Sequence, residues 1–217
     1  MPILLYIVFM KYLLFCFFIL GFNSQGVDIH NAAKTDVVSK WKLEKNKDGI
    51  KVYTRSAEGV AIKEFRAQTS VFCKIEELKS LLIKAENYPA WQANITTAKI
   101  LKQAKSTEQY IYYTSDLPWP VSDRDVVVNS KMSTNKEGVV TFNITGAPKY
   151  VDHKDDFLRI EKIVAKWTLT PKKNGEIEVL QQVTADPGGN IPTWLVNMLI
   201  VDGPFETFTN LRAKFKK

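Results

Sequence analysis

The amino-acid sequence predicts an α+β fold in which a curved antiparallel sheet is wrapped around one long C-terminal helix. Three observations carry this prediction. The last 30 or so residues are amphipathic with a helical period, about nine earlier segments have the character of strands, and polar turns separate most of those segments. A strongly twisted antiparallel sheet tends to curl, which leaves a space between the sheet and the helix. Periodicity does not decide whether side chains or a ligand fill that space.

The first 26 residues are expected to lie outside the fold. Residues 3–22 are almost wholly apolar, interrupted only by Lys11, and Ser24 and Gly26 follow at positions suited to cleavage. Read from Met10, which is an alternative start, this is the pattern of a secretory signal peptide. An uncleaved membrane anchor is the open alternative, since about 20 apolar residues can span a bilayer. We therefore expect an exported protein, periplasmic or secreted, with tethering to the membrane as the alternative.

Residues 27–39 are expected to form a linker or a short helix, and residues 40–217 the folded domain. The domain opens with three predicted strands, at residues 41–45, 50–56 and 60–72. A helix is predicted over Lys74–Glu86 because its apolar residues recur at helical spacing. Trp91 follows the end of this helix, either as an anchor that packs the helix onto the sheet or as a ligand contact.

Six further strands are predicted at residues 95–103, 108–114, 125–133, 139–145, 158–170 and 177–185, and consecutive antiparallel pairing is the simplest topology. Alternation along two of them places Val128, Ser130, Met132 and Phe142 on the dry face of the sheet. The opposite face, which carries Asp125 and several polar neighbours, is expected to be wet.

The C-terminal helix is predicted to follow the turn at residues 186–192, with Pro192 at its start. A kink is expected at Gly203-Pro204, since proline removes a backbone donor inside a helix. The predicted buried stripe, in steps of three and four residues, consists of Trp194, Met198, Val201, Phe205, Phe208, Leu211 and Phe215.

Composition argues against several classes of function. The net charge of +7 comes from scattered lysines without a basic stripe, so nucleic acid is not expected as a partner. His30 and His153 are isolated, and Cys73 is the only cysteine outside the predicted signal, so no metal site, cofactor or catalytic pair is expected.

Two motifs resemble the START domain, the StAR-related lipid-transfer module. They are the segments LPWPVSDRD at residues 117–125 and ADPGGNIPTWLVN at residues 185–197, supported by YPAW at residues 88–91 and by Trp167. The resemblance covers residues 41–217. It implies a helix-grip fold, in which the sheet and the C-terminal helix enclose a hydrophobic tunnel for one lipid-sized molecule and the helix acts as a gate.

Carried onto this chain, the resemblance and the strand alternation give a set of candidate residues. The candidate lipid contacts are Trp91, Tyr110, Tyr112, Val128, Ser130, Met132, Phe142, Trp167, Gln181, Trp194, Met198, Val201 and Phe205. Arg124 is expected at the tunnel wall, either in a structural salt bridge or as a wall charge. The candidate gate hinges are Gly188, Gly189 and Gly203.

The chain departs from the family's pattern at Ser130, which corresponds to a buried arginine that holds a polar ligand group in several animal members. An acyl chain, a sterol-like molecule or an isoprenoid is therefore expected over a zwitterion. The resemblance implies a monomer that binds and carries one hydrophobic ligand, with transient contact with a membrane surface. Two alternatives stay open: a cyclase-like or dehydratase-like enzyme using Glu108, Glu161 or Asp186, and an interaction protein with a solid core.

Overall fold

The computed structural model describes residues 40–56 and 63–216. These described residues belong to one compact unit. The predicted signal peptide or anchor at residues 1–26 and the predicted linker or helix at residues 27–39 lie outside the described residues.

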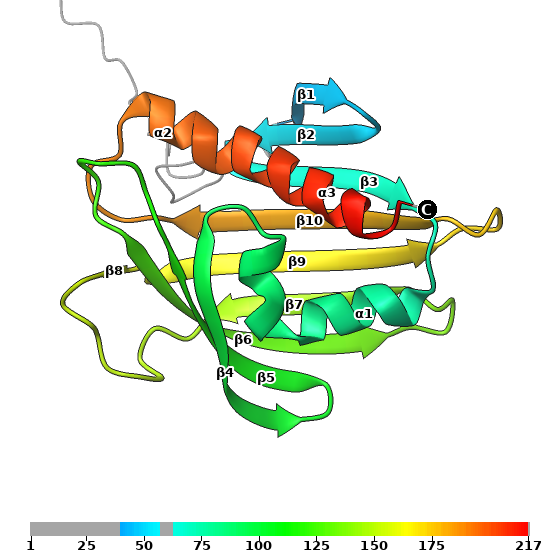
Figure 1. Ribbon diagram of the computed structural model, residues 1–217, viewed down its shortest axis with the longest axis horizontal. Helices are drawn as coiled ribbons and strands as arrows, with labels where there is room; N and C mark the ends of the chain where they lie inside the picture. The colour runs from blue at the N-terminus through cyan, green and yellow to red at the C-terminus, as the bar shows by residue number, and fades with distance from the viewer. Residues whose placement is uncertain (1–39, 57–62, 217) are drawn as a thin grey trace, which may run out of the picture. The chain divides into compact units, whose positions relative to one another are not determined.

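A ten-stranded sheet forms the body of the described chain (Figure 1). Its strands are β1 (Lys42–Lys47), β2 (Ile50–Arg55), β3 (Glu64–Val71), β4 (Ile95–Lys105), β5 (Glu108–Ser115), β6 (Arg124–Thr134), β7 (Val140–Gly146), β8 (Leu158–Arg159), β9 (Lys162–Pro171) and β10 (Ile177–Asp186). The order is β1-β2-β3-β10-β9-β7-β6-β5-β4, and every pair on this path is antiparallel.

The predicted consecutive pairing is right within β1–β3 and along β4 to β10, but the two groups join differently. Strand β3 pairs with β10, the last strand in the sequence, and the connection from β3 to β4 crosses the concave face. The segment 158–170, predicted as one strand, forms two. Strand β8 pairs in parallel with β6, and β9 then pairs with β7.

The crossing connection contains α1 (Ile75–Ile83) and a 3-10 helix, η1 (Ala85–Ala90). The first turn of α1 is capped by the Glu77 side chain, whose Oε2 accepts a 2.7 Å hydrogen bond from the Lys74 amide. The helix ends earlier than predicted, and the Tyr88 hydroxyl donates a 2.6 Å bond to the carbonyl of Leu82, close to this end.

The C-terminal helical region lies across the concave side of the sheet and consists of α2 (Thr193–Asn197), a π-helical turn η2 (Met198–Asp202) and α3 (Gly203–Lys214) (Figure 1). The irregularity immediately precedes Gly203-Pro204, since the Gly203 amide bonds the carbonyl of Met198 five residues back. Pro204 has no amide hydrogen to donate to the preceding turn.

Aromatic packing joins α3 to the sheet and to the segment after η1. Trp167 on β9 stacks on Phe208 of α3, with ring centroids 5.6 Å apart, and meets Trp91 at 5.8 Å. All three rings are buried in one core between the concave face, α1 and α3. This packing accounts for the buried C-terminal half of the predicted apolar stripe, Phe208 and Leu211.

The convex face of the sheet is only partly wet, which corrects the sequence-based expectation. Asp125 on β6 is buried there in an ion pair with Arg159 of β8, whose Nε lies 2.7 Å from Oδ1. Arg159 also donates to the carbonyls of Pro148, Val151 and Asp152. Strand alternation predicts the face of Asp125 correctly, but not that the segment between β7 and β8 covers it.

Candidate functional site

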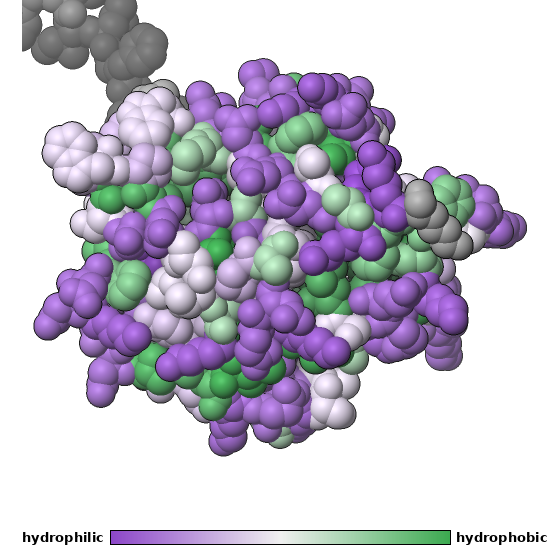
Figure 2. Space-filling view, viewed as in Figure 1, coloured by the Kyte–Doolittle hydropathy of each residue, from purple (hydrophilic) through white to green (hydrophobic). Residues whose placement is uncertain are grey.

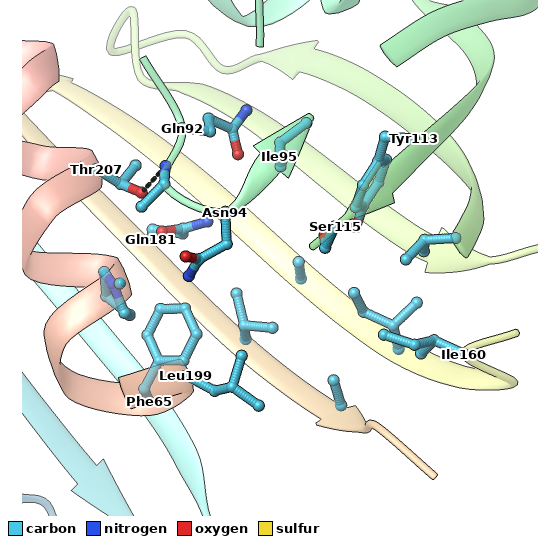
Figure 3. A pocket seen from close by; sticks show the side chains of 18 of the residues that line it. Phe65, Gln92, Asn94, Ile95, Tyr113, Ser115, Ile160, Gln181, Leu199 and Thr207 are labelled. Carbon is cyan, nitrogen blue, oxygen red and sulfur yellow. Dashed lines mark hydrogen bonds between the residues drawn. The ribbon is translucent and has the colours of Figure 1, made fainter. Parts of the chain in front are cut away.

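A pocket of about 230 Å³ lies between the C-terminal helical region and the concave face of the sheet (Figure 3). Strands β3, β5, β6, β7, β9 and β10 contribute one wall, η2 and α3 contribute another, and residues of η1, the segment after it and the start of β4 complete the lining. Its volume is just below the ~300–1,000 Å³ of sites for drug-sized ligands. The lining residues are Lys63, Phe65, Tyr88, Gln92, Ala93, Asn94, Ile95, Ile111, Tyr113, Ser115, Val126, Val128, Ile144, Ile160, Ile163, Ala165, Trp167, Gln181, Val183, Ala185, Pro187, Leu199, Ile200, Gly203, Pro204 and Thr207.

Most of the pocket wall is apolar because the strands present alternate residues to it. Val126 and Val128 face the pocket from β6, and Ile163 and Ala165 do so from β9. Ile144 of β7, the strand between them, also lines the pocket, so these three strands present a mostly aliphatic surface, as expected for a surface that contacts a hydrophobic ligand or packs a core.

Among the described lining residues, Lys63 is the only charged one, and it is exposed. Gln92, Asn94 and Gln181 contribute amides, and Tyr113 and Ser115 contribute hydroxyls (Figure 3). Burial raises the pKa of Tyr113 above its ordinary value, so this phenol stays neutral at physiological pH.

Four of the predicted site residues line the pocket: Val128, Trp167, Gln181 and Gly203. Three others, Ser130, Met132 and Phe142, lie on the same face of the sheet but surround a separate space of about 10 Å³ near Ile83 and Gln109. Trp91 does not line the pocket and packs in the core against Tyr88 and Trp167.

Tyr110 and Tyr112 were predicted on the wrong face of β5. Tyr110 stacks on Tyr150 with ring centroids 4.0 Å apart, and the ammonium groups of Lys99 and Lys154 lie over Tyr112. Their neighbours Ile111 and Tyr113 line the pocket instead. Both faces of β5 carry large side chains, so alternation alone gave no signal for which face is inward.

The predicted contacts on the C-terminal helix lie beside the pocket rather than on it. Trp194 is 51% exposed, and Lys45 Nζ lies 4.2 Å from the ring centroid of Phe205. Met198 and Val201 are half-buried outside the lining. The helical residues that do line it are Leu199, Ile200, Gly203, Pro204 and Thr207. The prediction assumed a continuous α-helix, and the π turn shifts the phase of the buried stripe.

Arg124 lies beside the pocket and is only 3% exposed. Its guanidinium donates hydrogen bonds to the carbonyls of Ser122, Pro187 and Gly188, the last two at 3.2 Å and 3.0 Å. Among the described residues it forms no ion pair, so the predicted structural salt bridge is replaced by bonds to backbone oxygens. Burial lowers the pKa of Arg124 from its ordinary value.

The three predicted hinge glycines have different backbones. Gly188 and Gly189 have φ values of +66° and +67°, which disfavour other residues. Gly203 is helical, with φ −59°, and a Cβ at its position would lie 3.1 Å from Asn94 Nδ2. Glycine is therefore needed at residue 203 for close approach rather than for a turn.

The carboxylates considered for acid–base chemistry point elsewhere. Glu108 Oε1 bonds Asn129 at 3.0 Å, Glu161 lies near His153, and Asp186 Oδ1 accepts a bond from the Gly188 amide. No carboxylate is among the described lining residues. Over residues 40–56 and 63–216, no three metal-binding side chains are grouped to hold an ion.

A curved antiparallel sheet that grips a C-terminal helix over a largely apolar pocket defines the helix-grip class of proteins. The chain belongs to the START domain family of this class, since the family's sequence model matches residues 32–217. This confirms the family resemblance and the fold that it implied.

Three relatives illustrate the match. An uncharacterized protein of Pseudomonas aeruginosa is 33% identical over 189 residues, which is 87% of this chain and 93% of the relative. A crystal structure of a STAR-related lipid transfer protein from Xanthomonas axonopodis is 34% identical, with a TM-score of 0.74 over 82% of this chain and 99% of that chain. The human phosphatidylcholine transfer protein is 22% identical over 175 residues, which is 75% of this chain and 78% of the relative.

Proposed function

We propose that this protein binds one hydrophobic, lipid-like molecule in the pocket beneath α3 and carries it without chemical change. The observation that carries the proposal is the largely apolar lining, whose only charged residue within the described chain is the exposed Lys63. Transfer of apolar surface from water to such a wall is favourable by roughly 25 cal/mol per Å². Membership of the START family and the likeness to a STAR-related lipid transfer protein support it.

Among the described residues, no carboxylate lines the pocket, which favours carriage over the enzyme alternative, since that chemistry needs a general acid or base beside the ligand. The human relative is named for phosphatidylcholine, but this chain would bind something smaller and uncharged. A pocket of about 230 Å³ leaves little room for a two-chain phospholipid unless the wall moves, and the described wall has no partner for a phosphate other than Lys63.

We place the gate for the ligand at the turn between β10 and α2. Pro187 of this turn and Leu199 of η2 line the pocket, and the turn contains the two left-handed glycines. We expect opening to move the turn together with η2. In η2, a π turn interrupts the regular helical hydrogen bonding.

The same end of the domain would contact a membrane. Trp119, in the loop between β5 and β6, is 91% exposed, and Trp194 in α2 is half exposed. Arg124 links the two segments, since it bonds Ser122 on one side and Gly188 on the other. Figure 2 shows pale and green side chains gathered over α2 and its neighbours, and tryptophan is a residue favoured at membrane interfaces.

Export stays part of the proposal and rests on residues 1–26 alone. In the described part of the chain, the helices are too short or too polar to cross a bilayer. The intact mass of the protein recovered from its host's soluble and membrane fractions tests it: cleavage near Gly26 gives a free exported carrier, whereas an uncleaved chain in the membrane fraction gives a tethered one. Full-length chain in the cytoplasm would contradict both.

Native mass spectrometry of the purified full chain, with lipid extraction from the same sample, tests the carrier proposal. We expect a monomer with one bound molecule per chain, released intact by organic solvent. A protein that stays empty after incubation with fluorescent fatty acid, sterol and long-chain alcohol would instead have a solid core, and the carrier proposal would fall.

A further inference from the structure

Three side-chain amides meet at one side of the pocket. Gln92 and Asn94 come from the segment between η1 and β4, and Gln181 comes from β10 (Figure 3). Thr207 of α3 lies beside them, whereas Tyr113 and Ser115 lie toward the other side. Within residues 40–56 and 63–216, none of the three amides has a hydrogen-bond partner, and none is among the fully buried unpartnered groups. They therefore face the open space of the pocket.

The backbone holds Asn94 in this position. Its φ of +63° is in the left-handed region, which asparagine tolerates better than most residues. The Ala93 amide donates a 3.0 Å bond to Thr207 Oγ1, and Asn210 Nδ2 bonds the Trp91 carbonyl at 3.3 Å. These two hydrogen bonds between α3 and residues 91–93 hold that segment in place. Because Gly203 has no side chain, there is room beside it for the Asn94 amide.

The chemistry of this cluster selects for an uncharged polar group. An amide offers both a donor and an acceptor, so it can pair with a hydroxyl or an ester. It cannot neutralise a carboxylate, a phosphate or an amine, and taking an unpaired charge out of water is costly. The aliphatic wall of β6 and β9 beyond the cluster suits a hydrocarbon chain.

We propose that Asn94 and Gln181, assisted by Gln92, bind the hydroxyl or ester head of an uncharged lipid whose chain lies along β6 and β9. This inference rests on the proposed function and adds the class of ligand. It makes Asn94 and Gln181 specificity-determining residues, and it distinguishes this pocket from one that holds a charged head.

Competition against 1-aminoanthracene, an uncharged fluorescent probe without a lipid head, tests the inference on the purified full chain. The competitors share one palmitoyl chain and differ in the head: monopalmitoylglycerol, palmitate and palmitoyl-lysophosphatidylcholine. We expect monopalmitoylglycerol to bind about 10-fold more tightly than either charged competitor. A 10-fold difference in affinity is the lower end of what is typical when buried polar groups are left without hydrogen-bond partners.

Two variants remove the amides with little change of shape. Asn94→Gly keeps a residue that accepts the positive φ, and Gln181→Leu keeps the strand. We expect each to lose most of the preference for monopalmitoylglycerol, measured as the ratio of its affinity to that of palmitate in the same variant. Gln68→Leu, on the opposite face of the neighbouring strand β3, is the matched control and should keep the preference.

The outcomes separate the two proposals. Probe binding without any preference among the heads, or a preference that survives both variants, would overturn this inference and leave the carrier function standing. Failure of the wild-type protein to bind the probe and all three lipids would overturn both. Thermal unfolding checks each variant, and if Asn94→Gly does not fold, Gln181→Leu alone decides the question.

Discussion

Arg124 Nη2 donates a 3.0 Å hydrogen bond to the carbonyl oxygen of Gly188, 64 residues further along the chain. With its bonds to Ser122 and Pro187, this buried guanidinium ties the start of β6 to the turn before α2. Because Pro187 of this turn lines the pocket, the proposed gate and the start of the sheet strand β6 share one side chain.

Replacement of Arg124 by methionine is expected to speed exchange of a bound fluorescent lipid several-fold, because the turn loses two hydrogen bonds, at Pro187 and Gly188, and its link to Ser122. The free energy of unfolding should fall by about 1–3 kcal/mol as the buried carbonyls lose their donor. Stopped-flow exchange and urea unfolding measure the two effects. Arg212→Met is the control: Arg212 bonds Thr69 Oγ1 at 2.9 Å, away from the turn, so it should alter stability without altering exchange.

Replacement of Gly188 and Gly189 by alanine is expected to slow lipid exchange, because the turn loses conformational freedom. Each alanine at positive φ should also cost about 1–2 kcal/mol of stability. Gly175→Ala is the matched control, with φ +84° and open space around its Cβ position. If the folded double variant exchanges lipid as fast as Gly175→Ala, the hinge prediction is wrong.

The ion pair between Asp125 and Arg159 should dominate the stability of the convex face. Both side chains are 1% exposed, so Arg159→Leu leaves a buried carboxylate without its partner and should cost about 3–5 kcal/mol. Asp125→Leu together with Arg159→Leu should cost less than the sum of the single replacements. Urea unfolding of the three variants measures this, and additive losses would contradict the coupling.

Cys73 is expected to react slowly with thiol reagents. Burial raises the pKa of its thiol to about 11, with a smaller contribution from Glu77. The reactive thiolate is therefore scarce below that pH, and at about pH 8 roughly one thiol in a thousand is ionised. In a Cys16→Ser background, labelling should be on the order of 100-fold slower than that of free cysteine and should accelerate as the pH approaches the raised pKa. A rate that matches free cysteine at about pH 8 would contradict the shift.

Trp119 and Trp194 should act in membrane contact and not in ligand affinity. Alanine at either position removes exposed aromatic surface, so transfer between vesicles should slow several-fold while the affinity for a soluble fluorescent ligand stays the same. Phe72→Ala is the control, since Phe72 is also exposed but lies against the C-terminal end of α3. Equal transfer rates for all three variants would remove the membrane contact from the proposal.

Local sequence patterns predicted most of the elements correctly. The strands of β4 to β7 appear within one or two residues of their predicted bounds, since alternation of apolar residues and turn residues is a local signal. The inward face of β6 was also predicted, because Val126, Val128 and Met132 have the opposite parity to the polar residues Asp125, Asn129 and Lys131, even though Val127 shares their parity. The pairing of β3 with β10 was not predicted, because it depends on contacts between segments more than 100 residues apart.

The candidate site was harder to predict than the fold. A phase shift of one residue, introduced by the π turn at Met198–Asp202, replaces Met198 by Leu199 in the pocket wall. Asn94 gave no signal in the sequence, because a single asparagine in a loop is common and its importance depends on the close approach to Gly203.

Sequence alone was enough to predict the family, most of the strands and helices along the chain, and the apolar character of the concave face. These follow from local periodicity and from motifs that are contiguous in the chain. Tertiary structure alone decided which side chains face the pocket, that carbonyl oxygens rather than a carboxylate hold Arg124, and that three amides meet at one wall. The physical reason is that each of these depends on the phase and crossing of distant elements, where a shift of one residue exchanges one face for the other.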